Sequence, residues 1–151
     1  MLPDLHFDDF AAGQRFETRG CTLSEAQILA FAWDHDPQPF HIDRVEAENG
    51  PYGGIIASGF QTLLVSFRLI YQEKVVSVAS MGSPGMDELR WLRPVRPGDT
   101  IRVRAEVLET RPSSSKSDRG TAIIRYETLN QHGETVMSFR IIHIFSRRPA
   151  G

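Results

Sequence analysis

Hydrophobic and polar residues alternate along the second half of the chain with the period of β-strands. Apolar residues occupy every second position from 101 to 107, and a second alternating run extends from 137 to 145. A period of two over such lengths predicts antiparallel strands with two distinct faces. Residues 130–134 (NQHGE) predict a hairpin turn. We therefore expect a meander of four strands after the central helix, with residues 111–120 (RPSSSKSDRG) as a mobile loop between strands.

Helical spacing of apolar residues marks two segments in the first half. Residues 60–73 have apolar side chains at positions 60, 63, 64, 67 and 71, and others on the remaining faces. This pattern predicts a buried helix with Gly59 at its N-terminal edge. Apolar positions 26, 29, 30 and 33 predict an earlier helix. Thr22 and Glu25 have capping-box spacing at its start, and it must end before Pro37.

Together these elements predict an α+β protein in which an antiparallel sheet wraps around one buried helix. The 151 residues suit a single domain, with a core at about 9–146. The net charge of −2 gives no basic surface for nucleic acid or membrane. The N-terminal residues lack the features of a signal peptide, and no apolar run is long enough to span a bilayer. With only one cysteine, Cys21, no internal disulfide is possible, and we expect a cytoplasmic protein.

Residues 36–43 (DPQPFHID) combine acids and a histidine with two prolines. Proline fixes φ and disfavours helix at the residue before it, so we expect a rigid extended stretch that aims side chains. Asp36 and His41 are candidate acid–base groups. A purely structural role, with Asp36 capping a turn, is the alternative. His35, Asp36, His41 and Asp43 could also offer metal ligands, but we expect no metal here. We expect Asp43 to cap a short helix that follows.

The motif resembles that of a known family. DPQPFHID, YGGIIASGF and LRWLRPVRPGDTIRVRAEVLE together resemble the MaoC-like dehydratases, the (R)-specific enoyl-CoA hydratases of the hotdog fold. The family motif is Asp-x-Asn-Pro-x-His-x-Asp, and Asp36, Pro39, His41 and Asp43 match it. The resemblance extends from about residue 9 to 146. Two positions depart from the family pattern: Gln38 replaces an Asn, and Ser58 replaces a frequent His.

The resemblance implies a hotdog fold and hydration of trans-2-enoyl-CoA to (R)-3-hydroxyacyl-CoA, or the reverse dehydration. Asp36 and His41 would be the catalytic pair, acting through one water. The Gly59 N–H would stabilise negative charge on the thioester oxygen, where the helix dipole is positive. Ser58 and Gln38 are further candidates for substrate binding. Candidates for the pocket wall are Phe40, Phe60 and Trp91, and candidates for contact with CoA phosphates are Lys116 and Arg119.

Two other functions are compatible with the same fold. A hotdog thioesterase usually has an acid on or beside its central helix, and residues 60–72 contain no Asp or Glu. A non-catalytic subunit that binds acyl thioesters would not need both Asp36 and His41. We expect no cofactor beyond the CoA thioester substrate, which CoA or acyl carrier protein could carry. A homodimer or a dimer of dimers is expected, because one small sheet cannot cover an apolar helix and also close an acyl pocket.

Overall fold

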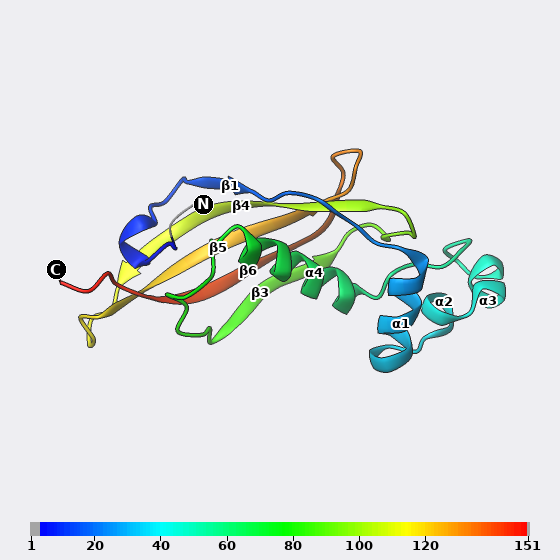
Figure 1. Cartoon of the computed structure of the whole chain (residues 1–151), viewed down its shortest axis with the longest axis horizontal. Helices are drawn as coiled ribbons and strands as arrows, with labels where there is room; N and C mark the ends of the chain where they lie inside the picture. Colours follow the sequence, from blue (N-terminus) through cyan, green and yellow to red (C-terminus); the bar gives the residue numbers. More distant parts are fainter. Residues whose placement is uncertain (1–3, 151) are drawn as a thin grey trace.

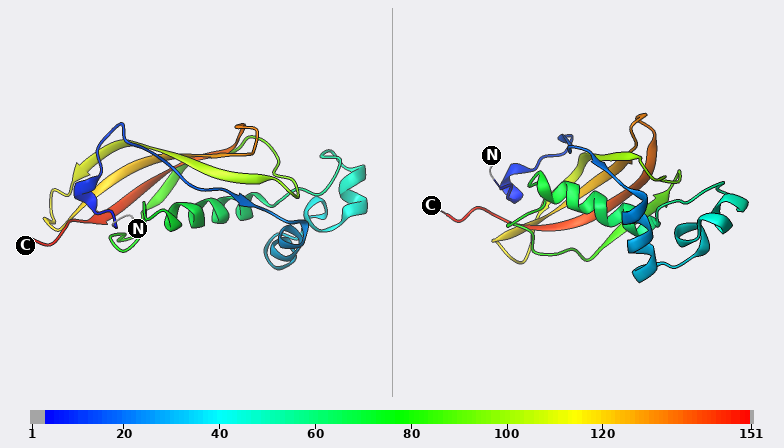
Figure 2. Two further views of the ribbon diagram at one scale, coloured as in Figure 1. Left: turned by 45° about the horizontal axis from the view of Figure 1, so that its top comes forward. Right: turned by 45° about the vertical axis from the view of Figure 1, so that its right-hand side comes forward.

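A computed structural model describes residues 4–150 (Figure 1). The elements in chain order are η1 (Phe7–Asp9), β1 (Arg15–Glu17), β2 (Cys21–Thr22), α1 (Glu25–His35), α2 (Pro39–Ile42), α3 (Arg44–Asn49), α4 (Gly59–Gln72), β3 (Gly85–Trp91), β4 (Thr100–Pro112), β5 (Arg119–Leu129) and β6 (Thr135–Ser146). The long strands form one curved sheet, and α4 lies along its concave face (Figures 1 and 2). This is the expected hotdog arrangement of an antiparallel sheet around a central helix.

The sheet has six strands, all paired antiparallel, in the order β1-β4-β5-β6-β3, with β2 also pairing β4. The alternation that predicted β4 and β6 is confirmed, because their inward side chains are buried at every second position. The hairpin turn at residues 130–134 is also confirmed. The four-strand meander was wrong in one respect. β3 pairs β6 and not β4, so only β4, β5 and β6 follow one another across the sheet.

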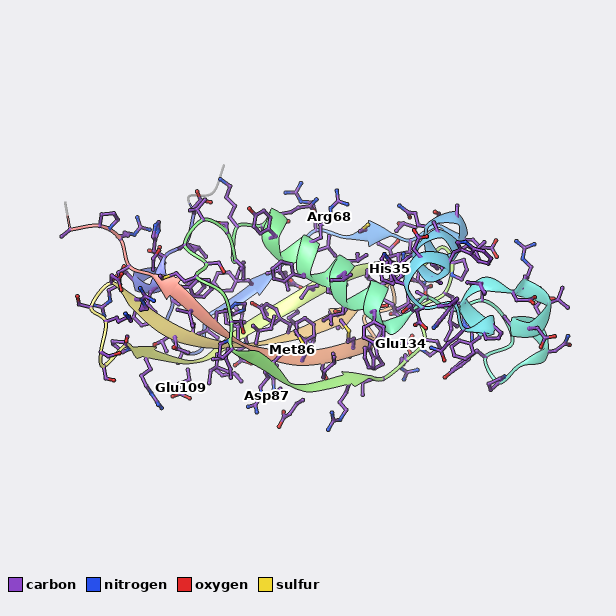
Figure 3. All side chains as sticks on the ribbon, turned by 90° about the horizontal axis from the view of Figure 1, so that it is seen from below. His35, Arg68, Met86, Asp87, Glu109 and Glu134 are labelled. Atoms are coloured by element: carbon purple, nitrogen blue, oxygen red, sulfur yellow. The ribbon has the colours of Figure 1, made fainter. Side chains whose placement is uncertain are left out.

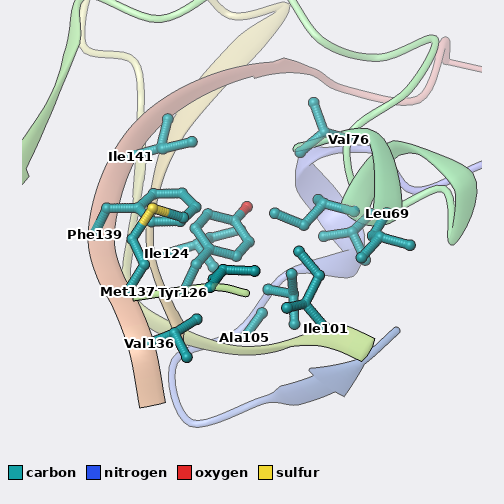
Figure 4. Packing of buried hydrophobic residues seen from close by; sticks show 14 of the residues in the cluster. Leu69, Val76, Ile101, Ala105, Ile124, Tyr126, Val136, Met137, Phe139 and Ile141 are labelled. Atoms are coloured by element: carbon teal, nitrogen blue, oxygen red, sulfur yellow. The ribbon is translucent and has the colours of Figure 1, made fainter. Parts of the chain in front are cut away.

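The core lies between α4 and the sheet (Figure 4). Large side chains from the strands fill it, including Tyr126 and Phe139, which stack with ring centroids 5.1 Å apart. Small polar residues let α4 approach the sheet closely. Ser66 on α4 shares a 2.7 Å hydrogen bond with Thr128 on β5, and both side chains are fully buried.

One apolar face of α4 is exposed in the single chain, so the helix is not buried all round as its composition suggested. Phe60, Leu64, Phe67 and Tyr71 are between 40% and 57% exposed. They recur every three or four residues and form one stripe. β3 is the edge strand beside this helix (Figure 3), and Met86 on it is also exposed.

The start of α1 also differs from expectation. Its N-cap is Ser24, which forms a capping box with Gln27, whereas Thr22 lies in β2. The buried face consists of Ile28 and Ala32, while Trp33 is 72% exposed. The helix ends at His35, before Pro37 as predicted. Within residues 4–150, no helix is long and apolar enough to cross a bilayer.

Candidate active site

Asp36 and His41 are positioned by the ends of two short helical segments. Asp36 is the C-cap residue of α1, where Pro37 prevents the helix from continuing. Pro39 occupies the first position of α2, which favours Pro because that N–H has no helical partner. Residues 39–42 are therefore one helical turn, and the extended stretch predicted for DPQPFHID is limited to the residues before it. Asp43 caps α3 by accepting a hydrogen bond from the Glu46 N–H, as predicted.

The two candidate catalytic groups meet in a nearly buried position. His41 Nε2 lies 3.3 Å from Asp36 Oδ2, and their side chains are only 5% and 11% exposed. The other ring nitrogen of His41, Nδ1, lies 2.7 Å from the carbonyl oxygen of Ile56. Because a carbonyl only accepts, Nδ1 carries a hydrogen. Nε2 is therefore the nitrogen that can exchange a proton beside Asp36.

Ser58 joins Asp36 to the first turn of α4. Its hydroxyl donates a 2.6 Å hydrogen bond to Asp36 Oδ2 and accepts one from the Phe60 N–H at 3.2 Å. Ser58 is fully buried and is the N-cap residue of α4. Gln38 donates to the other carboxylate oxygen of Asp36 at 2.7 Å. Both residues that depart from the family motif therefore contact the Asp36 carboxylate directly.

These contacts set the charge of Asp36. Burial raises the pKa of its carboxyl, but the hydrogen bonds from Ser58 and Gln38 and the nearby His41 imidazole lower it. The net result is a pKa below the usual range of an aspartic acid. Asp36 is thus ionised at neutral pH, although little of it is exposed. A carboxylate held in this way can accept a proton from a bound water.

Asp36 and His41 open onto a cavity of about 410 Å³. Its wall includes all of the predicted wall residues, Phe40, Phe60 and Trp91, together with Gln38 and Gly59. The lining residues not anticipated from the sequence are Tyr52, Ile56, Ala57, Thr62, Leu92, Arg93, Pro94, Val95 and Val136. Most of these are apolar, and several are almost completely buried, as expected for a site that accepts an acyl chain.

Gly59 is the first residue of α4, and its N–H makes no hydrogen bond to the described part of the chain. It lies at the positive end of a 14-residue helix and on the wall of the cavity. A Cβ on Gly59 would lie 2.4 Å from two atoms of the Trp91 indole. The absence of a side chain therefore serves close packing against Trp91, a contact that the sequence did not reveal.

The two residues that we expected to contact CoA phosphates lie away from the cavity. Lys116 and Arg119 belong to the β4–β5 hairpin, at the opposite end of the molecule from α1, α2 and α3 (Figures 1 and 2). Arg119 pairs with Asp118 at 2.9 Å. Two other arginines are nearer the cavity. Arg93 lines it and pairs with Glu134, and Arg96 donates to the carbonyl oxygen of Tyr52, another wall residue.

A second buried histidine, His143, lies outside the lining of this cavity. His143 is buried in the core, where it shares a 2.7 Å hydrogen bond with Tyr126. Burial lowers the pKa of His143 to about 4, so its ring is neutral at neutral pH. Among residues 4–150, no group of three or more His, Cys, Asp or Glu side chains is arranged to bind a metal ion.

Comparison with known proteins identifies the family. The model for the MaoC-like domain matches residues 9–128. The chain belongs to the MaoC-like dehydratase family. A crystal structure of a MaoC-like dehydratase from Rhodospirillum rubrum is 37% identical, has a TM-score of 0.86, and aligns over 97% of this chain and 99% of its own. This MaoC-like chain therefore shares its fold with that protein over almost the whole length of both chains.

Two curated relatives extend the comparison. The uncharacterized protein YdeM of Bacillus subtilis is 34% identical over 127 residues, covering 84% of the MaoC-like chain and 89% of YdeM. Mesaconyl-CoA hydratase of Cereibacter sphaeroides is 36% identical over 78 residues, which is 50% of this chain but only 22% of the hydratase. The family thus includes hydratases of acyl-CoA thioesters.

Proposed function

We propose that the protein hydrates trans-2-enoyl-CoA to (R)-3-hydroxyacyl-CoA, or catalyses the reverse dehydration. The observation that carries the proposal is the 3.3 Å approach of Asp36 Oδ2 to His41 Nε2 on the wall of a largely apolar cavity. Such a pair can hold one water between them and a substrate. The Gly59 N–H on the same wall, which has no hydrogen-bond partner among residues 4–150, supplies a donor for the thioester oxygen.

The ionised state of Asp36 and the position of His41 Nε2 suggest how the work is divided. Ionised Asp36 takes a proton from the water as its oxygen bonds to the β-carbon. The π electrons move towards the thioester, and negative charge builds on its oxygen opposite the Gly59 N–H. His41 then gives a proton from Nε2 to the α-carbon. Transfer of the proton from Asp36 to Nε2 restores the starting state, so atoms and charges balance.

The buried part of the wall supports an uncharged acyl group. Ile56, Ala57, Val95 and Val136 are each at most 6% exposed, and Arg93, the one Arg or Lys on the cavity wall, is 58% exposed at its side chain. A charged acyl end would remain unpaired among these side chains, which is costly. A short or medium aliphatic enoyl group therefore fits better than a dicarboxylic one.

A thioesterase receives no similar support. α4 contains no acid, and Glu73 directly follows it at the end far from the cavity. Glu73 also pairs with Arg19 at 2.9 Å.

The apolar stripe of α4, formed by Phe60, Leu64, Phe67 and Tyr71, supports the proposal that two copies pair as a homodimer. An exposed stripe of this kind usually marks an interface.

Crotonyl-CoA provides the direct test of activity. Hydration removes the conjugated double bond, and the loss of ultraviolet absorbance reports the rate. The product should be the (R)-3-hydroxyacyl thioester, and crotonyl-CoA should be hydrated faster than mesaconyl-CoA. Absence of hydration with both thioesters, together with absence of dehydration of 3-hydroxybutyryl-CoA, would refute the proposed function.

A further inference from the structure

The indole of Trp91 is the side chain in closest contact with Gly59. Trp91 is the last residue of β3, where it pairs with Met137 of β6. A Cβ built on Gly59 would lie 2.4 Å from both Nε1 and Cε2 of the indole. The face of the pyrrole ring, at its Nε1–Cε2 bond, thus covers the first residue of α4 and brings the indole nitrogen close to it. Phe60 supports the ring from one side, with centroids 5.9 Å apart and an angle of 71°.

The indole N–H is available to a ligand. Nε1 makes no hydrogen bond to any of residues 4–150, and Trp91 lines the cavity that also contains Asp36 and His41. Trp has a donor and no acceptor, so its N–H can only donate to such a ligand. Two other polar side chains on this wall are engaged, since Gln38 donates to Asp36 and Arg93 pairs with Glu134.

We propose that the Trp91 Nε1–H donates a second hydrogen bond to the thioester oxygen, beside the Gly59 N–H. This inference rests on the proposed hydratase function. During hydration the water oxygen bonds to the β-carbon and an electron pair moves onto the thioester oxygen. Two fixed donors stabilise that charge better than one. The charge returns to the α-carbon when His41 protonates it, so the indole N–H itself is never transferred.

The same arrangement explains why position 59 must be Gly. Any side chain there would displace the indole from the helix N-terminus, because the clash involves the ring itself. The two donors therefore depend on each other. α4 supplies one from its backbone, and β3 supplies the other from the Trp91 side chain that packs against it.

The first measurement compares Trp91→Phe with Trp33→Phe. Phe retains an aromatic ring beside Phe60 and Gly59 but lacks the N–H. Removal of one such donor costs about 10² to 10³ in kcat in enzymes where it has been measured. We expect a fall of about 10-fold to 10² for W91F, with a small change in KM. W33F makes the same change on α1 at a residue that is 72% exposed and outside the cavity, so its kcat should match the parent protein.

The second measurement uses the unaltered chain and the unreactive thioester butyryl-CoA. The protein has only two Trp residues, so its indole N–H groups give two NMR signals, and W33F assigns them. Saturating butyryl-CoA should move the Trp91 signal downfield and leave the Trp33 signal unchanged.

A third measurement compares W91F with the parent protein by infrared spectroscopy. The stretch of a ¹³C-labelled thioester carbonyl should lie at higher frequency on W91F, because one donor is lost.

These results distinguish Trp91 as a hydrogen-bond donor from Trp91 as a residue that only lines the cavity. A W91F protein with normal kcat, or a Trp91 N–H signal that does not move when butyryl-CoA is bound, would overturn the proposal. Failure of the proposed function would differ, because the parent protein would then not hydrate crotonyl-CoA at all. The NMR measurement on the unaltered chain needs only thioester binding, so it remains decisive if W91F folds poorly or turnover is slow.

Discussion

Ser58→Ala should move the acid side of the pH–rate profile to higher pH. The Ser58 hydroxyl donates a 2.6 Å hydrogen bond to Asp36, and this bond is one of the causes that hold the pKa of Asp36 below its usual range. Ala removes the donor and leaves the burial of Asp36, which raises the pKa, less opposed. The carboxylate then becomes protonated at a higher pH and stops acting as a base there. Activity at high pH should change less.

The magnitude follows from the geometry. A hydrogen bond to a charged group contributes about 1.5–3 kcal/mol. Asp36 is only 11% exposed at its side chain, so water replaces the lost donor poorly, but Gln38 and His41 still stabilise the charge. We therefore expect the lower part of this range. Since about 1.4 kcal/mol is tenfold in an equilibrium constant, the acid-side midpoint of kcat/KM should move up by about one pH unit.

Ser58→Ala also removes the cap of α4, which requires a matched control. Ser24 caps α1 in the same way, accepting from the Gln27 N–H, but has no contact with Asp36. Both S58A and S24A should lose about 1 kcal/mol of unfolding free energy from the missing cap. Only S58A should change the pH profile of crotonyl-CoA hydration. An unchanged acid side in S58A, or an equal displacement in S24A, would refute the reasoning.

Other substitutions test separate parts of the site and the assembly. Asp36→Asn and His41→Gln should each lower kcat for crotonyl-CoA by at least about 10², with a smaller change in KM, and near-normal turnover in both would place the chemistry elsewhere. Gly59→Ala should expel the Trp91 indole, seen as a change in Trp fluorescence in a W33F background, and lower kcat. Leu64→Glu puts a charge in the apolar stripe of α4, so light scattering should detect monomers where the parent protein forms dimers; a monomeric parent protein would contradict the homodimer.

The outline of the fold was predictable because alternation and helical spacing are local properties. β4, β6 and α4 were located to within a few residues. The face of α1 was not, because residues 28–33 are all apolar and any of several faces could have been the buried one. Its cap was ambiguous as well. Thr22 and Ser24 both precede a Glu or Gln by three positions, and pairing of Thr22 with Thr100 in the sheet decides between them.

The pairing of β3 with β6 had no local signal. Its burial pattern shows no alternation, since six of its seven residues are exposed and Leu89 is only half-buried. When both faces of an edge strand are exposed to solvent, the hydrophobic pattern does not specify its register. The exposure of the α4 stripe was missed for a related reason. A sequence shows that a residue is apolar, but not whether its own chain or a second copy covers it.

In the candidate site, too, contacts between residues close in the sequence were predictable, and contacts between distant residues were not. Asp36 and His41 could be paired from the sequence, because they are five residues apart and proline holds the segment between them. The contact of Ser58 with Asp36 spans 22 residues, and that of Trp91 with Gly59 spans a longer separation still. Both depend on how α4 sits against its neighbours. In the sequence, Ser58 was only a departure from the family motif. In the structure, its hydroxyl donates a hydrogen bond directly to the Asp36 carboxylate.

The two prolines position helix ends as well as side chains. Pro37 ends α1 so that Asp36 faces inward, and Pro39 begins the turn that carries His41. α4 also begins beside Asp36, because its cap residue Ser58 donates a hydrogen bond to the Asp36 carboxylate. One hydroxyl therefore fixes the start of α4 and also helps to keep Asp36 ionised. Because the N–H of Gly59 follows directly, one contact helps to set both the charge of the proposed base and the position of the proposed oxyanion donor. A substrate that enters this cavity meets both groups already oriented, which is the condition for stabilising a transition state without reorganisation.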